Sequence, residues 1–387
     1  MIDYEKVLSE RVRAMPPSGI RRFFEMLGDR QDVISLTVGQ PDFVTPWHIR
    51  EAGIRSIESG KTWYTANLGL PELRREIAAY LERRFRLSYD GASEIMVTVG
   101  GSEAIDTTLR ALIEQGDEVI LPQPSFVCYE PLARLYGAEV ITVDTKEEDA
   151  FKLTPEQLAA AITPKTKLLI LPYPNNPTGA ILTEEELQGL ASVLRNTDVM
   201  ILSDEIYGEL TYGRRHTSIA QIEGMRERTI LCSGFSKAYA MTGWRLGYLA
   251  APAPLMKQIY KIHQYGIMCA STASQFAAIE ALRAGDEDIE NMKAQYNRRR
   301  ILLTEGLREL GFSCFEPEGA FYVFPGVAQN GESSETFCKR LLDEAGVAVV
   351  PGSAFGKCGD GYARISYAYS VDHIKEALER IEKFMHG

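Results

Sequence analysis

Several features are scarce in this sequence of 387 residues. It has six cysteines, but they form no Cys-x-x-Cys pair and show no spacing typical of a metal site. No apolar run approaches the ~18 residues of a membrane span, and Met1–Met15 is charged throughout and lacks the apolar core of a signal peptide. We therefore expect a cytoplasmic protein with reduced thiols and no bound metal.

Positive charge is also in short supply. The chain has 42 Lys and Arg against 53 Asp and Glu, which gives a net charge of −11. This sign disfavours nucleic acids and anionic membranes as partners, because both attract basic surfaces. Apolar residues make up 45% and charged residues 25%, as in ordinary globular proteins. We found neither an internal repeat nor a low-complexity tract.

Short apolar runs recur through the middle of the chain and read as buried strands. They are Ile95–Val99, Glu118–Leu121, Val140–Val143, Leu168–Leu171, Val199–Ser203, Thr229–Ser233 and Leu246–Leu249. Between them lie segments with helical periodicity, at Glu103–Glu114, Pro155–Ile162 and Thr183–Leu194, and an earlier helix is expected at Pro71–Phe85. This alternation predicts an α/β fold in which helices cover both faces of a mostly parallel, seven-stranded sheet.

The last third of the chain has a different pattern. Long helices are expected at Ile289–Leu310 and Val371–Met385, with alternating, strand-like stretches at Phe312–Phe315 and Ala320–Phe324. A turn at Gly285-Asp286 marks a boundary. We therefore predict a large α/β domain over residues 46–284 and a smaller α+β domain made of residues 1–45 and 285–387.

Lys237 and Arg245 form the first candidate pair for chemistry. Lys237 follows the predicted strand at 229–233, and Arg245 lies eight residues further on, flanked by glycines. A desolvated lysine can form a Schiff base with a carbonyl, and a guanidinium can bind a phosphate with two hydrogen bonds. A phosphorylated aldehyde would use both groups, and pyridoxal 5'-phosphate is the common cofactor of that description.

Further residues answer the other needs of that cofactor. Asp204 ends a predicted strand, where open α/β sheets bind ligands, and its carboxylate suits a ring nitrogen. Gly101 and Ser102 open a helix whose amides could bind an anion. Phe126 offers a flat apolar face for a ring. Near the end of the chain, Arg364 lies in an apolar strand and requires a carboxylate partner from the protein or from a ligand.

These motifs together resemble the class I/II aminotransferases of the aspartate-aminotransferase fold, and the resemblance spans nearly the whole chain in the family's order. The motifs that carry it are Gly39-Gln40-Pro41-Asp42, Tyr64, Gly101-Ser102, Asn176-Pro177-Thr178-Gly179, Asp204-Glu205-Ile206-Tyr207, Ser236-Lys237, Gly243-Trp244-Arg245 and Arg364. The resemblance implies fold type I of the pyridoxal-phosphate-dependent enzymes and a homodimer with a shared active site.

The resemblance also implies a role for each matching residue. Lys237 would be the Schiff-base lysine, Asp204 the partner of the pyridine nitrogen, and Phe126 the stacking ring. Tyr207 and Asn176 would hydrogen-bond the ring oxygen. The phosphate would be held by Gly101, Ser102, Ser236, Arg245 and, from the other subunit, Tyr64. Arg364 would bind the substrate α-carboxylate, with Gly39 and Asn176 nearby. The chain departs from the commonest family pattern at Gly234, often a phosphate-binding serine, and at Phe126, often a tryptophan.

We therefore expect a transaminase that moves the α-amino group of an amino acid to a 2-oxo acid. No arginine or lysine is spaced to meet a second substrate carboxylate, which favours a broad or aromatic donor, with aspartate still possible and 2-oxoglutarate as acceptor. A β-lyase that splits C–S bonds on the same scaffold remains the alternative.

Two other classes fit less well. A serine hydrolase would require a nucleophile elbow, but the run from Gly100 ends on Ala104 and no oxyanion segment is present. A transcription regulator with an aminotransferase-like domain would require a DNA-binding domain and a basic surface, whereas only 32 residues precede the strand expected at Val33–Leu36.

Overall fold

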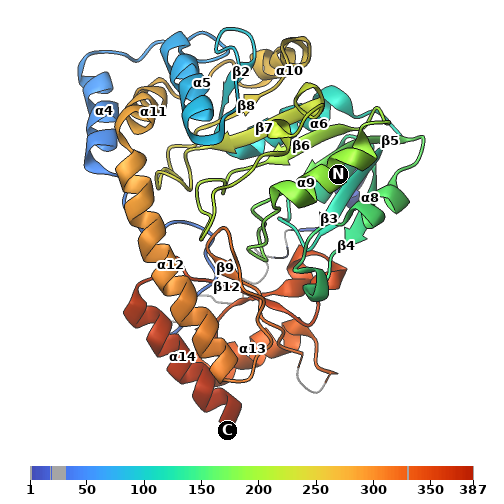
Figure 1. The fold of residues 1–387 in the computed structure, drawn as a ribbon, viewed down its shortest axis with the longest axis vertical. Helices are drawn as coiled ribbons and strands as arrows, with labels where there is room; N and C mark the ends of the chain where they lie inside the picture. The colour runs from blue at the N-terminus through green and yellow to red at the C-terminus, as the bar shows by residue number, and fades with distance from the viewer. Residues whose placement is uncertain (1, 18, 20–31, 329–330, 387) are drawn as a thin grey trace.

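The computed structural model describes residues 2–17, 19, 32–328 and 331–386. Its central feature is a seven-stranded sheet in the order β2-β8-β7-β6-β5-β3-β4 (Figure 1). The strands are β2 (Ile95–Thr98), β3 (Glu118–Gln123), β4 (Glu139–Asp144), β5 (Thr166–Leu171), β6 (Met200–Asp204), β7 (Thr229–Gly234) and β8 (Gly247–Ala250). Strand β8 runs antiparallel to both of its neighbours, and the other pairs are parallel.

All seven strands expected from the sequence are present, and the predicted fold class is confirmed. Apolar runs form these strands because both faces of the sheet are covered. In β2, for example, Met96 packs with one set of helices and Val97 with the opposite set. A strand buried on both faces gains from an apolar residue at every position, so the run is continuous and does not alternate.

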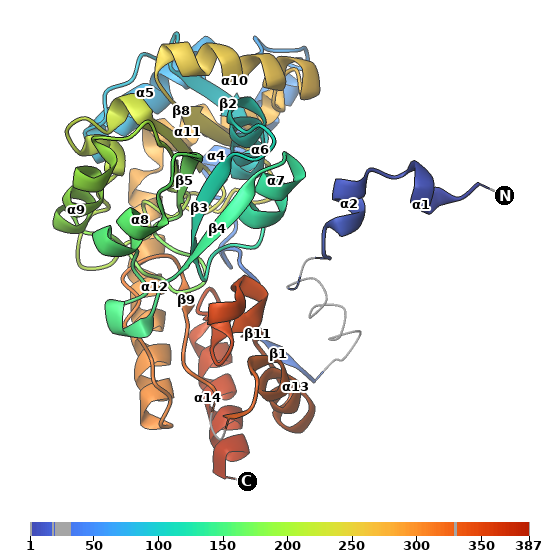
Figure 2. The same ribbon diagram turned by 90° about the vertical axis from the view of Figure 1, so that its right-hand side faces the viewer.

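Helices cover the two faces of this sheet. One face packs against α6 (Gly100–Leu112), α7 (Tyr129–Leu135) and α10 (Ala253–Gly266). The other face packs against α5 (Pro71–Phe85), α8 (Pro155–Ala161), α9 (Glu184–Leu194) and α11 (Thr272–Ala284), and α4 (Trp47–Glu58) lies against α11. Figure 2 shows the two groups of helices on either side of the twisted strands.

Local signals in the sequence explain where several helices begin. Thr183 and Glu186 form the expected capping box at the start of α9, each side chain bonding the other residue's backbone N–H. Pro71 occupies the first turn of α5, where its missing N–H is not needed. Helix α6 begins at Gly100, three residues before the start expected from periodicity.

A second, smaller layer is built mainly from the C-terminal part of the chain. Helix α12 (Asp286–Glu309) runs from the large sheet to this layer and packs on α14 (Val371–His386), which in turn packs on α13 (Ser334–Ala345) (Figures 1 and 2). Its strands are β9 (Tyr322–Val323), β11 (Val350–Pro351) and β12 (Ala363–Ser366), in the order β11-β12-β9. Two N-terminal helices, α1 (Tyr4–Val7) and α2 (Glu10–Ala14), stand to one side of the molecule in Figure 2.

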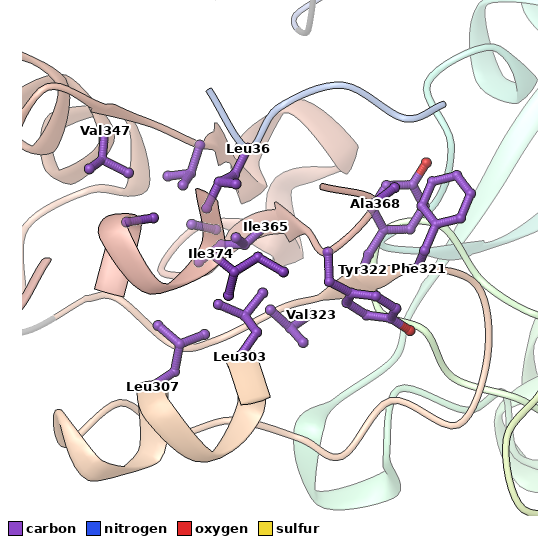
Figure 3. Packing of buried hydrophobic residues seen from close by; sticks show 14 of the residues in the cluster. Leu36, Leu303, Leu307, Phe321, Tyr322, Val323, Val347, Ile365, Ala368 and Ile374 are labelled. Atoms are coloured by element: carbon purple, nitrogen blue, oxygen red, sulfur yellow. The ribbon is translucent and has the colours of Figure 1, made fainter. Parts of the chain in front are cut away.

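The core of this layer joins distant parts of the chain. Strand β1 (Ile34–Ser35) pairs in parallel with β10 (Val347–Ala348), so an N-terminal segment belongs to the C-terminal layer. Figure 3 shows Leu303 of α12 facing Val323 and Ile374, with Leu36 close by. This pairing is consistent with the predicted grouping of the two chain ends, while the domain limits at 45/46 and 284/285 stay a prediction.

One strand expectation for this layer was wrong. Residues Phe312–Phe315 do not form a strand; only Ser313 makes a single bridge, to Gly326. The alternating pattern reflects burial of Phe312 and Cys314 in the core. Because no other segment that the structure describes pairs along this stretch, the pattern is satisfied by packing without a ladder of hydrogen bonds. The expected strand at Ala320–Phe324 is present but reduced to β9.

Candidate active site

The predicted site residues meet at one cavity of about 390 Å³ beside the carboxyl ends of the parallel strands. Eleven of the twelve line it: Gly39, Gly101, Ser102, Phe126, Asn176, Asp204, Tyr207, Ser236, Lys237, Arg245 and Arg364. This volume is typical of a pocket for a small organic ligand. The cavity draws on both layers, since Arg364 lies in β12 and Asp204 ends β6.

Lys237 lies just beyond β7 and points into the cavity. Its Nζ donates a hydrogen bond to the carbonyl oxygen of Gly39 at 2.6 Å. The pKa of Lys237 is lowered to about 8, first by burial and then by the positive charges of Arg364 and Arg245, against the opposing effect of the Asp204 carboxylate. A lysine with this pKa has a substantial neutral fraction near pH 8, which is the form that attacks a carbonyl.

Asp204 is buried at the end of β6 with two hydrogen bonds to its carboxylate. The hydroxyl of Tyr129 donates to Oδ2 at 2.7 Å, and the backbone N–H of Ile206 donates to Oδ1 at 3.2 Å. Burial nevertheless raises the pKa of Asp204 to about 6, since desolvation outweighs both bonds. Burial therefore destabilises the charged carboxylate unless a cation binds next to it.

The first turn of α6 forms an anion-binding end of the cavity. The free backbone N–H groups of a helix start attract negative charge, and Gly101 and Ser102 line the cavity there. Gly100 has a φ of 73°, and a Cβ at this position would lie 2.6 Å from Nη2 of Arg245. The positive φ favours glycine here, and the missing side chain leaves room for the guanidinium beside the helix.

Arg364 is held in a fixed orientation on the opposite side. Its Nη1 donates to Oδ1 of Asn176 at 2.9 Å, and its Nη2 donates to the carbonyl oxygen of Thr37. The guanidinium carbon lies 4.5 Å from the ring centre of Tyr322 and 4.9 Å from that of Phe355. The buried Nε has no hydrogen-bond partner within the described residues. Nor does any carboxylate in the described ranges pair with this guanidinium, so it is suited to bind one from a ligand.

Tyrosine side chains complete the wall of the cavity. The hydroxyl groups of Tyr207 and Tyr322 lie 2.8 Å apart, and burial raises the pKa of Tyr207 well above its usual value. A side chain on Gly39 would clash with the Tyr322 hydroxyl. The ring of Phe126 contacts that of Tyr129 edge to face, with centres 6.0 Å apart.

Tyr64 is the one predicted site residue outside the cavity. Its side chain is 78% exposed and lies in the loop before α5. The neighbouring Trp63 is also exposed, although its carbonyl oxygen accepts a 2.7 Å hydrogen bond from Thr272. The loop is therefore anchored to the chain while its two aromatic side chains face outward.

Among the lining residues that were not predicted, Tyr129 and Tyr322 form hydrogen bonds to predicted site residues. Tyr129 lies three residues after Phe126, at the start of α7, but a lone tyrosine near a helix start gives no signal of its own. Tyr322 occurs in an apolar strand that is predicted equally well as core. Outside the cavity, no cluster of three His, Cys, Asp or Glu able to hold a metal occurs among the described residues.

The chain is similar to known aminotransferases over nearly its whole length. A family model described as "Aminotransferase class I and II" matches residues 31–381. The protein YugH of Bacillus subtilis (strain 168), whose name describes an aminotransferase, is 52% identical over 98% of both chains. An aspartate aminotransferase of Pyrococcus abyssi is 43% identical, also over 98% of both chains.

Solved structures of aminotransferases are also similar to this chain. The crystal structure of an aromatic aminotransferase from Pyrococcus horikoshii superposes with a TM-score of 0.89 at 43% identity, covering 94% of this chain and 98% of the other. None of the helices described here is long and apolar enough to cross a membrane.

Proposed function

Because the chain belongs to the class I and II aminotransferases, we propose that it transfers the α-amino group of a broad set of amino acids, aromatic ones among them, to a 2-oxo acid. The family depends on pyridoxal phosphate, so this chain is a pyridoxal-phosphate-dependent aminotransferase. The observation that carries the proposal is that Lys237, Asp204 and Arg364 line one cavity.

The donor set in the cavity fits this cofactor. Asp204 is buried, and a protonated ring nitrogen would supply the cation that its carboxylate requires. The start of α6 and Arg245 meet where a phosphate could be bound, and no side chain on Gly100 separates them. Lys237 and its lowered pKa suit attachment to an aldehyde.

Roles for the residues follow from this placement. The bound cofactor supplies an aldehyde and a ring that accepts electrons. Asp204 would keep the proton on the ring nitrogen, and Tyr207 and Asn176 would donate to the ring oxygen. Phe126 would cover one face of the ring. Lys237 would act as general base and then as general acid: it would take the proton from the substrate Cα and pass it to a carbon atom of the cofactor.

Arg364 would bind the substrate carboxylate, which also orients the Cα–H bond. Its aromatic neighbours exclude water from the guanidinium, so a carboxylate would meet an already ordered and partly desolvated partner. Among the described residues, the cations lining the cavity are Lys237, Arg245 and Arg364, each with a role above. In the described part of the chain, no further cation lines the cavity to meet a second substrate carboxylate, which supports a broad or aromatic donor.

The proposal includes a homodimer with shared active sites. Its support is Tyr64, which is exposed on an anchored loop and would reach the phosphate bound by the other subunit. We also propose a cytoplasmic location, consistent with six cysteines that are all free.

The test uses the purified enzyme and a panel of amino acids with 2-oxoglutarate as acceptor. We expect several aromatic and other donors to be used, and borohydride reduction to leave a pyridoxyl adduct on Lys237. The Lys237→Ala variant should show neither turnover nor adduct. An adduct on another lysine would overturn the assignment, strict use of aspartate would overturn the donor class, and release of pyruvate from cystathionine without an acceptor would favour the β-lyase.

A further inference from the structure

A buried histidine and glutamate connect two segments that the proposed function assigns to the cofactor phosphate. His263 of α10 and Glu103 of α6 are 0% and 9% exposed. His263 Nδ1 lies 2.5 Å from Glu103 Oε1, and His263 Nε2 lies 2.8 Å from the carbonyl oxygen of Asn67. Neither residue touches the cavity that holds Lys237, so neither has a role in the chemistry described above.

The hydrogen-bond partners determine where the protons lie. A carbonyl oxygen can only accept, so His263 Nε2 carries a hydrogen and donates it to Asn67. The short contact between Nδ1 and Glu103 Oε1 requires one further proton between these two atoms. The other oxygen of Glu103 accepts the backbone N–H of Val99 at 2.5 Å. Both nitrogens of His263 and both carboxylate oxygens of Glu103 therefore have a hydrogen-bond partner in this chain of bonds from Asn67 to Val99.

One end of this chain of bonds is the phosphate-binding turn of α6. Glu103 lies in the first turn of the helix, directly after Gly101 and Ser102. Its bond to the backbone of Val99 spans the junction between β2 and the helix. The direction in which the first N–H groups of α6 point is thus tied to the position of Glu103.

The other end is the loop that carries Tyr64. Asn67 is held by three bonds: the one from His263, one from the Tyr260 hydroxyl at 3.1 Å, and one that it donates to the carbonyl oxygen of Met268 at 2.7 Å. These contacts anchor the loop three residues beyond Tyr64, whose own side chain stays exposed.

We propose that His263 and Glu103 are positioning residues that hold the start of α6 and the Tyr64 loop in one fixed arrangement. This inference rests on the proposed dimer, in which α6 binds the phosphate of its own subunit and Tyr64 binds that of the partner. One pair of side chains then aligns phosphate donors for both active sites. A buried polar pair costs desolvation that an apolar pair would avoid, so its use here fits a need for defined geometry.

The first test compares pyridoxal 5'-phosphate with pyridoxal, which lacks the phosphate. The dissociation constant of pyridoxal divided by that of pyridoxal 5'-phosphate, both measured on the apoenzyme by absorbance, isolates the phosphate contacts. In His263→Leu we expect this ratio to fall roughly tenfold, the effect of about one lost hydrogen bond to a charged group. Glu103→Leu removes the same hydrogen bond by changing the other partner. It replaces His263→Leu in this test if that variant does not fold.

Two further variants separate positioning from stability. Glu103→Gln should keep the wild-type ratio, because its amide oxygen can accept from Val99 and its NH₂ can donate to Nδ1 of neutral His263. Leu109→Ala creates a cavity in the same helix, two turns away. It should lower the melting temperature and leave the ratio unchanged. Equal ratios in wild type and in His263→Leu would overturn the inference.

Hybrid dimers test whether one pair serves both sites. In the first hybrid, one chain carries His263→Leu and the other carries Lys237→Ala. The one site that keeps Lys237 then uses the altered α6 and a wild-type Tyr64 loop. In the second, both changes lie on one chain, and the working lysine is in the wild-type chain but faces the altered Tyr64 loop. We expect the ratio to fall in both. A fall in the first hybrid alone would overturn the link between sites.

The wild-type enzyme separates this inference from the proposed function. If wild-type apoenzyme does not bind pyridoxal 5'-phosphate on Lys237 more tightly than pyridoxal, the proposed function fails. If it does, and the leucine variants keep the wild-type ratio, only the positioning role fails.

Discussion

Tyr129 donates its hydroxyl hydrogen to Oδ2 of Asp204 at 2.7 Å, inside the buried end of the cavity. The bond stabilises the charged carboxylate and so opposes the effect of burial, which raises the pKa of Asp204 to about 6. After burial, this bond is the largest influence on the pKa of Asp204.

Tyr129→Phe should shift the acid limb of the activity profile to higher pH. Without the hydroxyl, the pKa of Asp204 rises further, so less carboxylate is present to hold the proton of the cofactor nitrogen. At pH 7 we expect kcat to fall roughly fivefold, as for one lost hydrogen bond, with a smaller loss at pH 9. Tyr173→Phe removes another buried hydroxyl, one bonded to the carbonyl oxygen of Phe151, and should leave the profile in place.

Asp204→Asn should stabilise the cofactor-free protein at neutral pH while abolishing efficient turnover. The folded pKa of about 6 lies above the ordinary value of 3.8, so the folded state binds a proton more tightly than the unfolded state. The stability that this proton provides is complete below pH 4 and is lost as the pH rises through 6. We therefore expect the asparagine variant to be up to about 3 kcal/mol more stable at pH 8, by the linkage of two pKa units.

Urea unfolding of both apoproteins between pH 4 and pH 8 would measure this difference, which should vanish at the acid end. Asp90 provides a control of opposite sign. Its exposed carboxylate accepts bonds from Ser93 and Ala92, which lower its pKa. Asp90→Asn should therefore reduce stability at neutral pH, and a gain there would contradict the electrostatic argument.

Arg364→Lys should weaken substrate binding far more than it slows the chemical step. Lysine cannot reproduce the two bonds to Asn176 and Thr37 or the stacking between two rings. We expect KM for amino acids to rise tenfold to a hundredfold, about 1.5–3 kcal/mol. An amine substrate without a carboxylate should be unaffected. Arg228→Lys, at an arginine that bonds carbonyl oxygens away from the cavity, should change stability but not KM.

Lys237→Ala and Tyr64→Glu should restore activity when the two inactive homodimers are mixed and refolded together. In a hybrid, one site carries both changes and the other carries neither, provided that Tyr64 belongs to the partner's site. Activity should approach one working site per hybrid dimer. Hybrids confirmed by a mass tag but without activity would place Tyr64 elsewhere. Tyr265→Glu, at a residue 90% exposed on α10, tests for a general effect of a surface charge.

The sequence was sufficient for elements whose environment is uniform along their length. A strand buried on both faces, such as β5, leaves an unbroken apolar run, and α5 was predicted with both of its ends. Helix α6 begins earlier than expected because glycine has a low helix propensity, and the positive φ that favours glycine at position 100 is not visible in the sequence.

The site was predicted where chemistry demands an unusual residue and missed where a common one suffices. Lys237, Asp204 and Arg364 are charged residues next to apolar strands, and such residues require an explanation. Tyr129 and Tyr322 are indistinguishable in sequence from core tyrosines, since their partners become neighbours only through folding. The bond between His263 and Glu103 spans 160 residues and is likewise invisible to local patterns.

Arg364 and Lys237 belong to different layers, since β12 lies in the three-stranded sheet and Lys237 follows a strand of the large one. A molecule held at one end beside Lys237 and at the other by Arg364 therefore acts as a crosslink between two parts of the chain. Saturating ligand should make their melting more nearly all-or-none, so that calorimetric and van't Hoff enthalpies converge. While it is bound, the substrate would therefore add to the contacts that hold the two layers together.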